Sequence, residues 1–315
     1  MVHSRTGCGE DQPRPGDVAG TAAGARLIDV TLYTDPACPW AYSERPALRV
    51  LQWRYGAQLR WRLVVIGLTE DASQYEARGY TPLRGALGQL AFRRYGMPFA
   101  PAPKERVSAT ARACRAVVAT RLAAPGSEWA VLDALQLANF TTALLLDDDE
   151  QLEAVLGTVA GIDAVRIVST LDSPEVTGAY ERDRAQARTA AGSAAELQGK
   201  TAGTDGKVRF TAPSMIFERG GTRLVAGGFQ PVEAYDVLVA NLDPTLERRP
   251  PPENAAPLLA CFAGGLTTQE VAALMTSGND APDRGATEAA LLELMAAGEA
   301  VRDAIGDDAL WKPAR

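Results

Sequence analysis

Cys38 lies at the junction of an expected strand, residues 27–33, and an expected helix, residues 39–55. Pro39 suits the first position of a helix, because the N–H that proline lacks would be unpaired there. A thiol at this point lies beside unpaired backbone N–H groups and the positive end of the helix dipole, so we expect its pKa to be lowered. The pattern predicts that Cys38 reacts as a nucleophilic thiolate.

The sequence around Cys38 resembles the active-site turn of DsbA-like thioredoxin-fold proteins, and the intracellular FrnE-like branch in particular. It reads Asp-Pro-Ala-Cys-Pro-Trp-Ala over residues 35–41, where that family normally has Cys-Pro-Trp-Cys. The second cysteine of that motif is replaced by Ala41. The resemblance implies a thiol–disulfide oxidoreductase. With Cys38 alone, attack on a disulfide stops at a mixed disulfide until an external thiol arrives.

A second part of the site follows from the same resemblance, which covers residues 26–242. In thioredoxin-fold proteins a cis-proline before the third strand faces the active-site cysteine, and the residue before it offers backbone groups to an extended substrate. Pro213, preceded by Ala212 and followed by an apolar strand pattern, matches that placement. The resemblance therefore implies a catalytic-site role for Pro213 and a substrate-binding role for Ala212, Pro39 and Trp40. An ordinary trans proline at the first residue of a strand is the alternative.

Two aromatic residues follow the cysteine, Trp40 and Tyr42. We expect them at the rim of the active-site cleft or packed against the helical insertion.

Cys114 lies in an expected helix, residues 106–122, between Arg112 and Arg115, which are one turn apart on the same face. The two guanidinium groups could bind the carboxylates of a low-molecular-weight thiol of the glutathione or mycothiol type, or could simply be solvated. Such a thiol would be a co-substrate, and no tightly bound cofactor is expected. Cys114 could replace the missing second thiol, although a packed helical cysteine is the more common situation.

The overall composition excludes several function classes. A net charge of -7 argues against a nucleic-acid-binding surface, and no run of eighteen apolar residues suggests a membrane span. The four cysteines, Cys8, Cys38, Cys114 and Cys261, have neither C-x-x-C nor zinc spacing, so we expect no metal site and a reducing, cytoplasmic location. The only histidine is His3, which excludes most histidine-dependent mechanisms.

The expected fold class is α/β, a thioredoxin-like fold with a large all-α insertion and a small C-terminal winged-helix-like domain. Residues 26–69 give a strand, helix and strand, and residues 197–246 give a hairpin and a helix, which together form the two halves of a thioredoxin fold. Residues 70–196 between them are almost entirely helical in pattern. Residues 1–25 are expected to be a disordered tail.

Residues 253–315 carry three expected helices and a hairpin, an order that resembles a winged-helix domain. A capping box from Thr267 to Glu270 starts the second of these helices. The segment is net negative and would repel DNA phosphates, so we expect a packing role, a protein partner or self-association.

Two other functions remain open from the sequence. One is a thiol-conjugate transferase or isomerase of the kappa-class glutathione transferase or 2-hydroxychromene-2-carboxylate isomerase type, where serine usually occupies the position of Cys38. The other is a non-enzymatic redox-sensing or protein-binding module.

Overall fold

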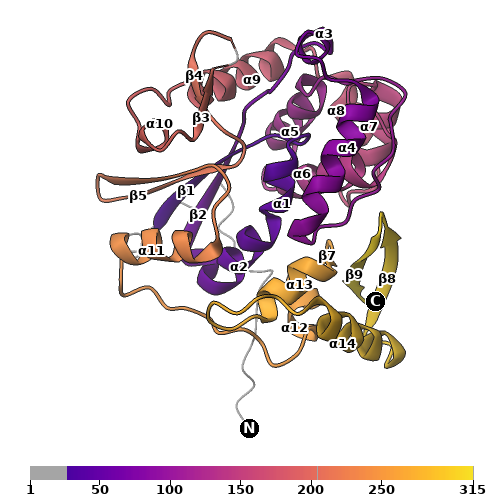
Figure 1. Cartoon of the computed structure of the whole chain (residues 1–315), viewed down its shortest axis with the longest axis vertical. Helices are drawn as coiled ribbons and strands as arrows, with labels where there is room; N and C mark the ends of the chain where they lie inside the picture. Colours follow the sequence, from indigo (N-terminus) through magenta and orange to yellow (C-terminus); the bar gives the residue numbers. More distant parts are fainter. Residues whose placement is uncertain (1–26, 204, 315) are drawn as a thin grey trace. The chain divides into compact units, whose positions relative to one another are not determined.

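The computed structural model describes residues 27–203 and 205–314. The expected N-terminal tail, with Cys8 and His3, lies outside these ranges. The described chain divides into two compact units by its internal contacts. Figure 1 labels the helices and strands. The site unit comprises residues 29–44 and 61–230, and the terminal unit comprises residues 45–60 and 231–314 together with residues 27–28. The domain boundaries drawn from the sequence remain predictions.

A four-stranded sheet in the order β2-β1-β5-β6 brings the two ends of the thioredoxin-like segment together. Its strands are β1 (Ile28–Thr34), β2 (Leu59–Val65), β5 (Ser214–Arg219) and β6 (Thr222–Gly227). β5 pairs antiparallel with both β1 and β6, and Tyr33 lies opposite Ser214. The end of β1, just before Cys38, is therefore next to the start of β5, just after Pro213.

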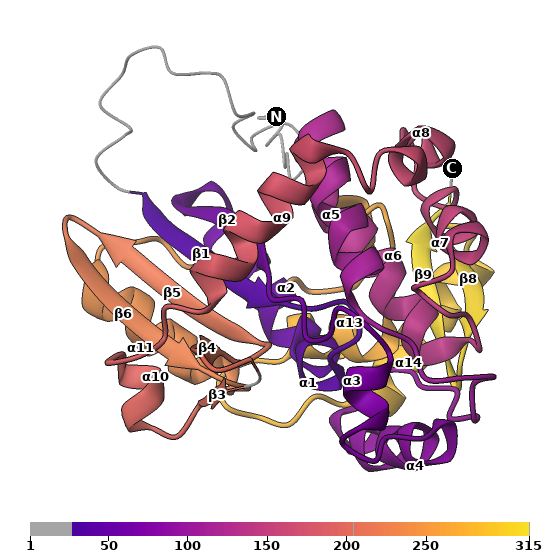
Figure 2. The ribbon, with the colours of Figure 1, turned by 90° about the horizontal axis from the view of Figure 1, so that it is seen from above.

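The residues between β2 and β5 are mainly helical, as the sequence predicted. They form α3 (Ser73–Glu76), α4 (Pro82–Phe92), η3 (Arg93–Tyr95), α5 (Ala111–Ala123), α6 (Glu128–Thr141), α7 (Asp149–Leu156), α8 (Ala164–Ser169), α9 (Pro174–Ala187) and α10 (Ala194–Leu197). α5 and α9 lie side by side (Figure 2). Arg121 of α5 forms an ion pair with Asp183 of α9 at 3.1 Å, and Asp183 also accepts a hydrogen bond from the backbone of Val65 in β2.

Two expectations for the site unit are wrong. We expected one helix over residues 39–55, but the chain forms α1 (Pro39–Ser43) and α2 (Arg45–Tyr55) with a break at Glu44. The break precedes Pro46, which has no N–H to donate to the carbonyl of Tyr42. The glycine-rich, polar composition of residues 199–206 is typical of a loop, but β3 (Thr201–Gly203) pairs antiparallel with β4 (Val208–Phe210).

The terminal unit combines α2 with the C-terminal part of the chain. Its other elements are η2 (Gly56–Gln58), α11 (Val232–Leu242), α12 (Ala256–Cys261), β7 (Leu266–Thr267), α13 (Thr268–Met275), α14 (Arg284–Ala296), β8 (Ala300–Ile305) and β9 (Asp308–Pro313). The three helices and the hairpin expected after residue 253 are confirmed, and the capping box of Thr267 and Glu270 is formed.

The terminal unit has a hydrophobic core to which both α2 and the C-terminal elements contribute. Val50 and Trp53 of α2 belong to the same cluster as Leu258, Leu291 and Trp311. The C-terminal helices therefore do not enclose a core of their own, because α2 supplies part of it.

A buried ion-pair cluster also joins these two parts. The carboxylate of Glu270 is completely buried and accepts hydrogen bonds from Nε of Arg45 at 3.1 Å and Nε of Arg49 at 3.3 Å. Glu270 has this position because it is the third residue of α13, where its other oxygen accepts the backbone N–H of Thr267.

Candidate functional site

Cys38 is the N-cap residue of α1, with Pro39 at the first helical position. Its thiol donates a hydrogen bond of 3.0 Å to the carbonyl oxygen of Ala212. The bond from Ala212 to Pro213 is cis. The structure thus brings together three of the residues that the sequence placed at the site, across a separation of 174 positions between Cys38 and Ala212.

The pKa of Cys38 is shifted in the opposite direction from the sequence-based expectation. Burial of the thiol, helped by the negative charge of Asp35, raises its pKa from 9.0 to about 12. Hydrogen bonds from the backbone N–H groups of Ala41 and Trp40 and the charge of Arg209 lower it, but they do not outweigh burial. The expectation failed because Cys38 is only 7% exposed, so burial outweighs the backbone N–H groups at the start of α1.

Asp35 organises the polar contacts beneath Cys38. It is completely buried. Its Oδ1 accepts the N–H of Ala37 at 2.9 Å, and its Oδ2 accepts the N–H of Leu68 at 3.0 Å, the hydroxyl of Thr110 at 2.9 Å and the thiol of Cys114 at 3.4 Å. Burial raises the pKa of Asp35 above its ordinary value, while these hydrogen bonds lower it.

The sequence alone leaves Asp35 two roles, turn chemistry with Pro36 or a nearby acid that tunes the thiolate. Thr110 and Leu68 were missed, since no local pattern shows that they reach the same carboxylate. The available signal was an aspartate at the end of an apolar strand, which must find donors if it is buried.

Cys114 is a buried free thiol, as is Cys38. Burial and the charge of Asp35 raise its pKa well above the ordinary value. The two thiols donate to different acceptors, Cys38 to a backbone carbonyl and Cys114 to a carboxylate. This is the packed helical cysteine that the sequence offered as the alternative to a second redox thiol.

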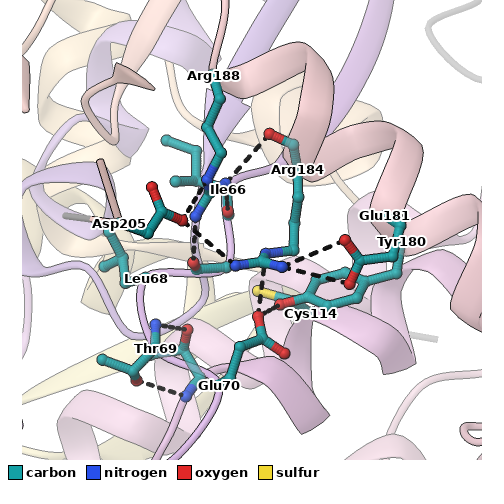
Figure 3. A network of polar contacts seen from close by, with 12 residues as sticks. Ile66, Leu68, Thr69, Glu70, Cys114, Tyr180, Glu181, Arg184, Arg188 and Asp205 are labelled. Carbon is teal, nitrogen blue, oxygen red and sulfur yellow. Dashed lines mark hydrogen bonds and ion pairs between the residues drawn. The ribbon is translucent and has the colours of Figure 1, made fainter. Parts of the chain in front are cut away.

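A polar network holds the loop that follows β2 (Figure 3). The hydroxyl of Tyr180 donates to Oε1 of Glu70 at 2.6 Å, and Nε of Arg184 is 3.0 Å from the same oxygen. Arg188 donates to the carbonyl of Ile66 at 3.0 Å and forms an ion pair of 2.6 Å with Asp205. The network fixes residues 66–70, and the N–H of Leu68 in this loop bonds Asp35.

Four aromatic rings gather beside the cysteine. Trp40, which is 39% exposed, contacts Phe92, Tyr95 and Phe229 with centroid separations of 4.8, 5.6 and 5.6 Å. We call these four residues the aromatic cluster. Trp40 therefore lies at the protein surface next to Cys38.

Tyr42, the other aromatic residue considered for the cleft rim, is buried. It stacks on Phe140 at 4.7 Å, contacts Phe99 at 5.3 Å and donates a hydrogen bond to the carbonyl of Pro98. It packs against the helical insertion, which is the second of the two positions expected for it.

The two arginines proposed for carboxylate binding have partners within the insertion. Arg112 forms ion pairs with Asp149 and with Asp172 at 2.5 and 2.7 Å, and Arg115 reaches Asp172 at 3.3 Å. Both share a helix face, as their spacing predicted. In this structure both guanidinium groups pair with acidic residues of the insertion, and their binding of a carboxylate remains a prediction.

Arg209 was missed in the sequence. It is 7% exposed on β4, and its guanidinium donates to the carbonyl of Phe210 at 3.0 Å. Burial lowers its pKa, and its charge in turn favours the thiolate form of Cys38.

Within residues 27–203 and 205–314 there is no cluster of three or more potential metal ligands. In the same ranges no helix has both the length and the apolar character that crossing a bilayer requires.

Comparison with known structures supports the fold. A candidate protein disulfide isomerase from Nitrosomonas europaea is 18% identical, with a TM-score of 0.50 over 70% of this chain and 97% of the other. A probable DsbA oxidoreductase from Streptomyces coelicolor is also 18% identical, with a TM-score of 0.52 over 72% of this chain and 93% of the other. No curated protein is similar enough to count as a match.

The sequence pattern of the DSBA-like thioredoxin domain matches residues 29–191, just over half of the chain. The expected fold class, a thioredoxin-like α/β fold with a helical insertion, is confirmed by this match together with the sheet order and the helices described above. The chain belongs to the DSBA-like thioredoxin domain family, a family of thiol–disulfide oxidoreductases.

Proposed function

We propose that this protein is a monothiol thiol–disulfide oxidoreductase in which Cys38 is the nucleophile. The observation that carries the proposal is the 3.0 Å contact of the Cys38 thiol with the carbonyl of Ala212, combined with alanine at position 41. The first places a thiol next to backbone that can pair with a substrate strand. Alanine at position 41 means that the motif lacks the second thiol, which would otherwise attack the mixed disulfide and release the product.

The first step begins with loss of the Cys38 proton to solvent. The Cys38 sulfur then attacks one sulfur of a substrate disulfide, a new S–S bond forms, and the other substrate sulfur leaves as a thiolate. No electrons are gained or lost overall at this stage. The product is a mixed disulfide between Cys38 and the substrate.

The second step uses an external low-molecular-weight thiol of the glutathione or mycothiol type. Its thiolate attacks the substrate sulfur of the mixed disulfide and expels Cys38 as a thiolate, and a second molecule of the thiol then reduces the new mixed disulfide. The substrate disulfide is reduced and two small thiols are oxidised to their disulfide. A reducing, cytoplasmic location would supply such a thiol.

Substrate docking also supplies a way to activate a thiol whose pKa is high. An extended substrate that pairs with the backbone of Ala212 would compete for the carbonyl that now accepts the thiol proton. The freed thiol would then lose a partner that stabilises its neutral form, while the charge of Arg209 continues to favour the thiolate. We therefore expect reactivity to rise when a substrate strand is bound.

Adduct formation tests the proposal. The protein is incubated with an oxidised small thiol and its intact mass is measured, with Cys38→Ser and Cys114→Ser as a matched pair of variants. We expect an adduct that peptide mapping places on Cys38, that disappears in Cys38→Ser and that persists in Cys114→Ser. An adduct that survives in Cys38→Ser with unchanged yield, or that is lost in Cys114→Ser, contradicts the proposal.

A thiol-conjugate transferase or isomerase is the second candidate. It is favoured by Ala41 and by the protonated state of Cys38, since in that chemistry the small thiol is the reactant and the enzyme side chain only needs to donate a hydrogen bond. The same Cys38→Ser variant decides between the two. Retained activity on electrophilic substrates with a small thiol would favour the second candidate.

A further inference from the structure

A cavity of about 400 Å³ lies in the terminal unit, between the C-terminal end of α2 and the segment that follows α11. Residues 53–58 line one side of it and residues 247–250 line the other, and it is partly open to solvent. We call it the α2–linker cavity. Its volume is sufficient for a small molecule.

Hydrogen bonds hold the two walls of the α2–linker cavity in place. The indole N–H of Trp53 donates to the carbonyl of Pro250 at 2.9 Å. The side-chain amide of Gln58 donates to the carbonyl of Glu247 at 2.8 Å and accepts the N–H of that residue at 3.0 Å. A Cβ at Gly56, between the walls, would meet no atom within 4 Å. The cavity is therefore formed, with open space inside it, before any ligand binds.

The walls of the cavity carry three guanidinium groups and one carboxylate, which belong to Arg54, Arg248, Arg249 and Glu247. The charge of Arg54 is paired with the carboxylate of Asp236 in α11. Arg248, in contrast, donates to the backbone carbonyl of Asp236 at 3.4 Å, and among residues 27–203 and 205–314 no carboxylate pairs with it. A carbonyl leaves the charge of a guanidinium uncompensated, so Arg248 is the group that attracts an anion.

Aromatic rings support two of these guanidinium groups. The guanidinium carbon of Arg249 is 4.4 Å from the ring centroid of Trp53, and that of Arg248 is 5.9 Å from the ring centroid of Tyr55. Such contacts restrict the arginine side chains, so less conformational entropy is lost when they bind a ligand. Both rings are themselves buried and offer no free face on which a nucleobase could stack. The arrangement favours a compact anion.

The end of α2 does little to oppose an anion. A helix C-terminus is repulsive to negative charge because its last carbonyl groups lack donors. Here the carbonyl of Arg54 accepts the N–H of Arg249 at 2.8 Å, and the carbonyl of Tyr55 accepts the amide of Gln58 at 3.0 Å. These donors weaken the negative field that the helix end would otherwise exert on the cavity.

We propose that the α2–linker cavity binds the phosphate group of a small phosphate monoester. At pH 7 such a group has a charge of about -1.5 to -2 and three acceptor oxygens. It can accept N–H donors from more than one guanidinium, whereas a carboxylate has one negative charge and two oxygens. This inference goes beyond the proposed function, because it lies in the terminal unit and involves no thiol chemistry.

Isothermal titration calorimetry of the full-length protein with glycerol 3-phosphate, at low ionic strength, tests the inference. The variants are Arg248→Gln, which removes the uncompensated charge, and Glu247→Gln, which removes the acid of the wall but keeps its backbone. The matched control is Arg302→Gln. Arg302 is exposed on β8 in the same unit, and its guanidinium carbon is 5.7 Å from the ring centroid of Trp311.

We expect Arg248→Gln to weaken binding by at least about tenfold, because charge-assisted hydrogen bonds to the phosphate are lost. Glu247→Gln should tighten binding, because it removes a like charge from the wall, and added salt should reduce this gain. The control should keep the affinity of the wild-type protein. A gain of affinity does not result from misfolding, so Glu247→Gln carries the test if Arg248→Gln fails to fold.

The inference is overturned if millimolar glycerol 3-phosphate gives no heat of binding, or if Arg248→Gln binds it as tightly as the wild-type protein. Acetate at the same ionic strength separates a phosphate site from a general attraction of anions, and equal affinity for acetate also overturns the inference. Vesicles that contain phosphatidic acid present the same headgroup chemistry at a membrane. Binding to these vesicles without binding of glycerol 3-phosphate would assign the cavity to a lipid surface and would contradict a small-molecule ligand. None of these measurements involves Cys38, so each is independent of thiol reactivity.

Discussion

The thiol of Cys38 donates to the carbonyl oxygen of Ala212 at 3.0 Å, so the reactive atom and the proposed docking backbone share one hydrogen bond. The same bond stabilises the neutral thiol and occupies the acceptor that a substrate strand would use. Substrate pairing and the hydrogen bond that keeps the thiol neutral therefore compete for a single carbonyl. This relationship predicts a low basal reactivity.

The pH dependence of Cys38 alkylation should reveal that low reactivity. With a pKa of about 12, its rate should rise steadily above pH 8 and show no plateau by pH 10, because the thiolate fraction at pH 7 is on the order of 10⁻⁵. Iodoacetamide labelling resolved by peptide mass mapping measures this, with Cys38→Ser as background and the urea-unfolded protein as reference. A plateau below pH 8 would contradict burial as the dominant effect.

The same shift predicts how stability depends on pH. A thiol whose pKa is raised on folding stabilises the folded state. The full stabilisation is present at pH values below the unfolded pKa, near 9.0, and it is lost as the pH rises through about 12. Cys38→Ser should therefore flatten the decrease in unfolding free energy between pH 9 and 12.

Ala41→Cys should restore a dithiol mechanism. Ala41 is three residues after Cys38 in α1, the position that the related motif gives to its second cysteine. We expect the mixed disulfide to become short-lived and an internal disulfide to form, seen as the loss of two hydrogens in the intact mass. A matched Ala37→Cys variant places the new thiol before Cys38 and should leave the adduct long-lived.

Asp35→Ala should destabilise the site unit by about 3 kcal/mol, because it leaves several buried donors without an acceptor. The donors are the N–H groups of Ala37 and Leu68, the hydroxyl of Thr110 and the thiol of Cys114. Urea unfolding measures the change, and Asp280→Ala at an exposed position is the control. A change within about 0.5 kcal/mol would show that Asp35 does not organise these groups.

Alanine substitutions at Gly67 and Gly56 should separate the cost of backbone strain from the cost of steric overlap. Both have positive φ, +62° and +53°, but a Cβ at Gly67 would lie 2.2 Å from the hydroxyl of Tyr180, whereas none of the atoms around Gly56 comes within 4 Å. Gly56→Ala should cost about 1–2 kcal/mol through strain alone. Gly67→Ala should cost more than about 3 kcal/mol, since Tyr180 is held by Glu70. Equal costs in denaturant unfolding would disprove the steric contribution.

Glu270→Ala should destabilise the terminal unit by about 4 kcal/mol, since it leaves two buried arginines without their carboxylate. The loss of the capping box on α13 adds to this effect. Differential scanning calorimetry checks the outcome against Glu293→Ala, an exposed acid on α14. A shift no larger than that of the control would show that the cluster contributes little.

Much of the site's framework could be predicted from residue patterns near each position. Cys38 and Pro39 are placed by a strand pattern, a helix pattern and proline's missing N–H, all of which are local. The hairpin of β5 and β6 follows from its turn, and the start of α13 follows from its capping box. Arg112 and Arg115 share a face because helical spacing requires it.

The chemistry of the site depends on residues that meet only after folding. Thr110 and Cys114 are 75 and 79 positions from Asp35, and no local pattern links them to it. The pKa of Cys38 follows from its burial in a cluster that includes Phe210 and Ala212, which are far from it in the sequence. β3 was missed because a segment rich in glycine reads as a loop, and only its pairing with β4 makes it a strand.

The core that α2 shares with the C-terminal helices has a practical consequence for truncation experiments. A chain shortened after residue 252 would lose Leu258, Leu291 and Trp311 from around Trp53, and would leave Arg45 and Arg49 with no Glu270. The remaining fragment would expose an apolar helix face and two formerly buried cations on the segment that directly follows α1. The C-terminal residues are thus not a detachable module, and an inactive truncated fragment would say nothing about whether they bind a partner.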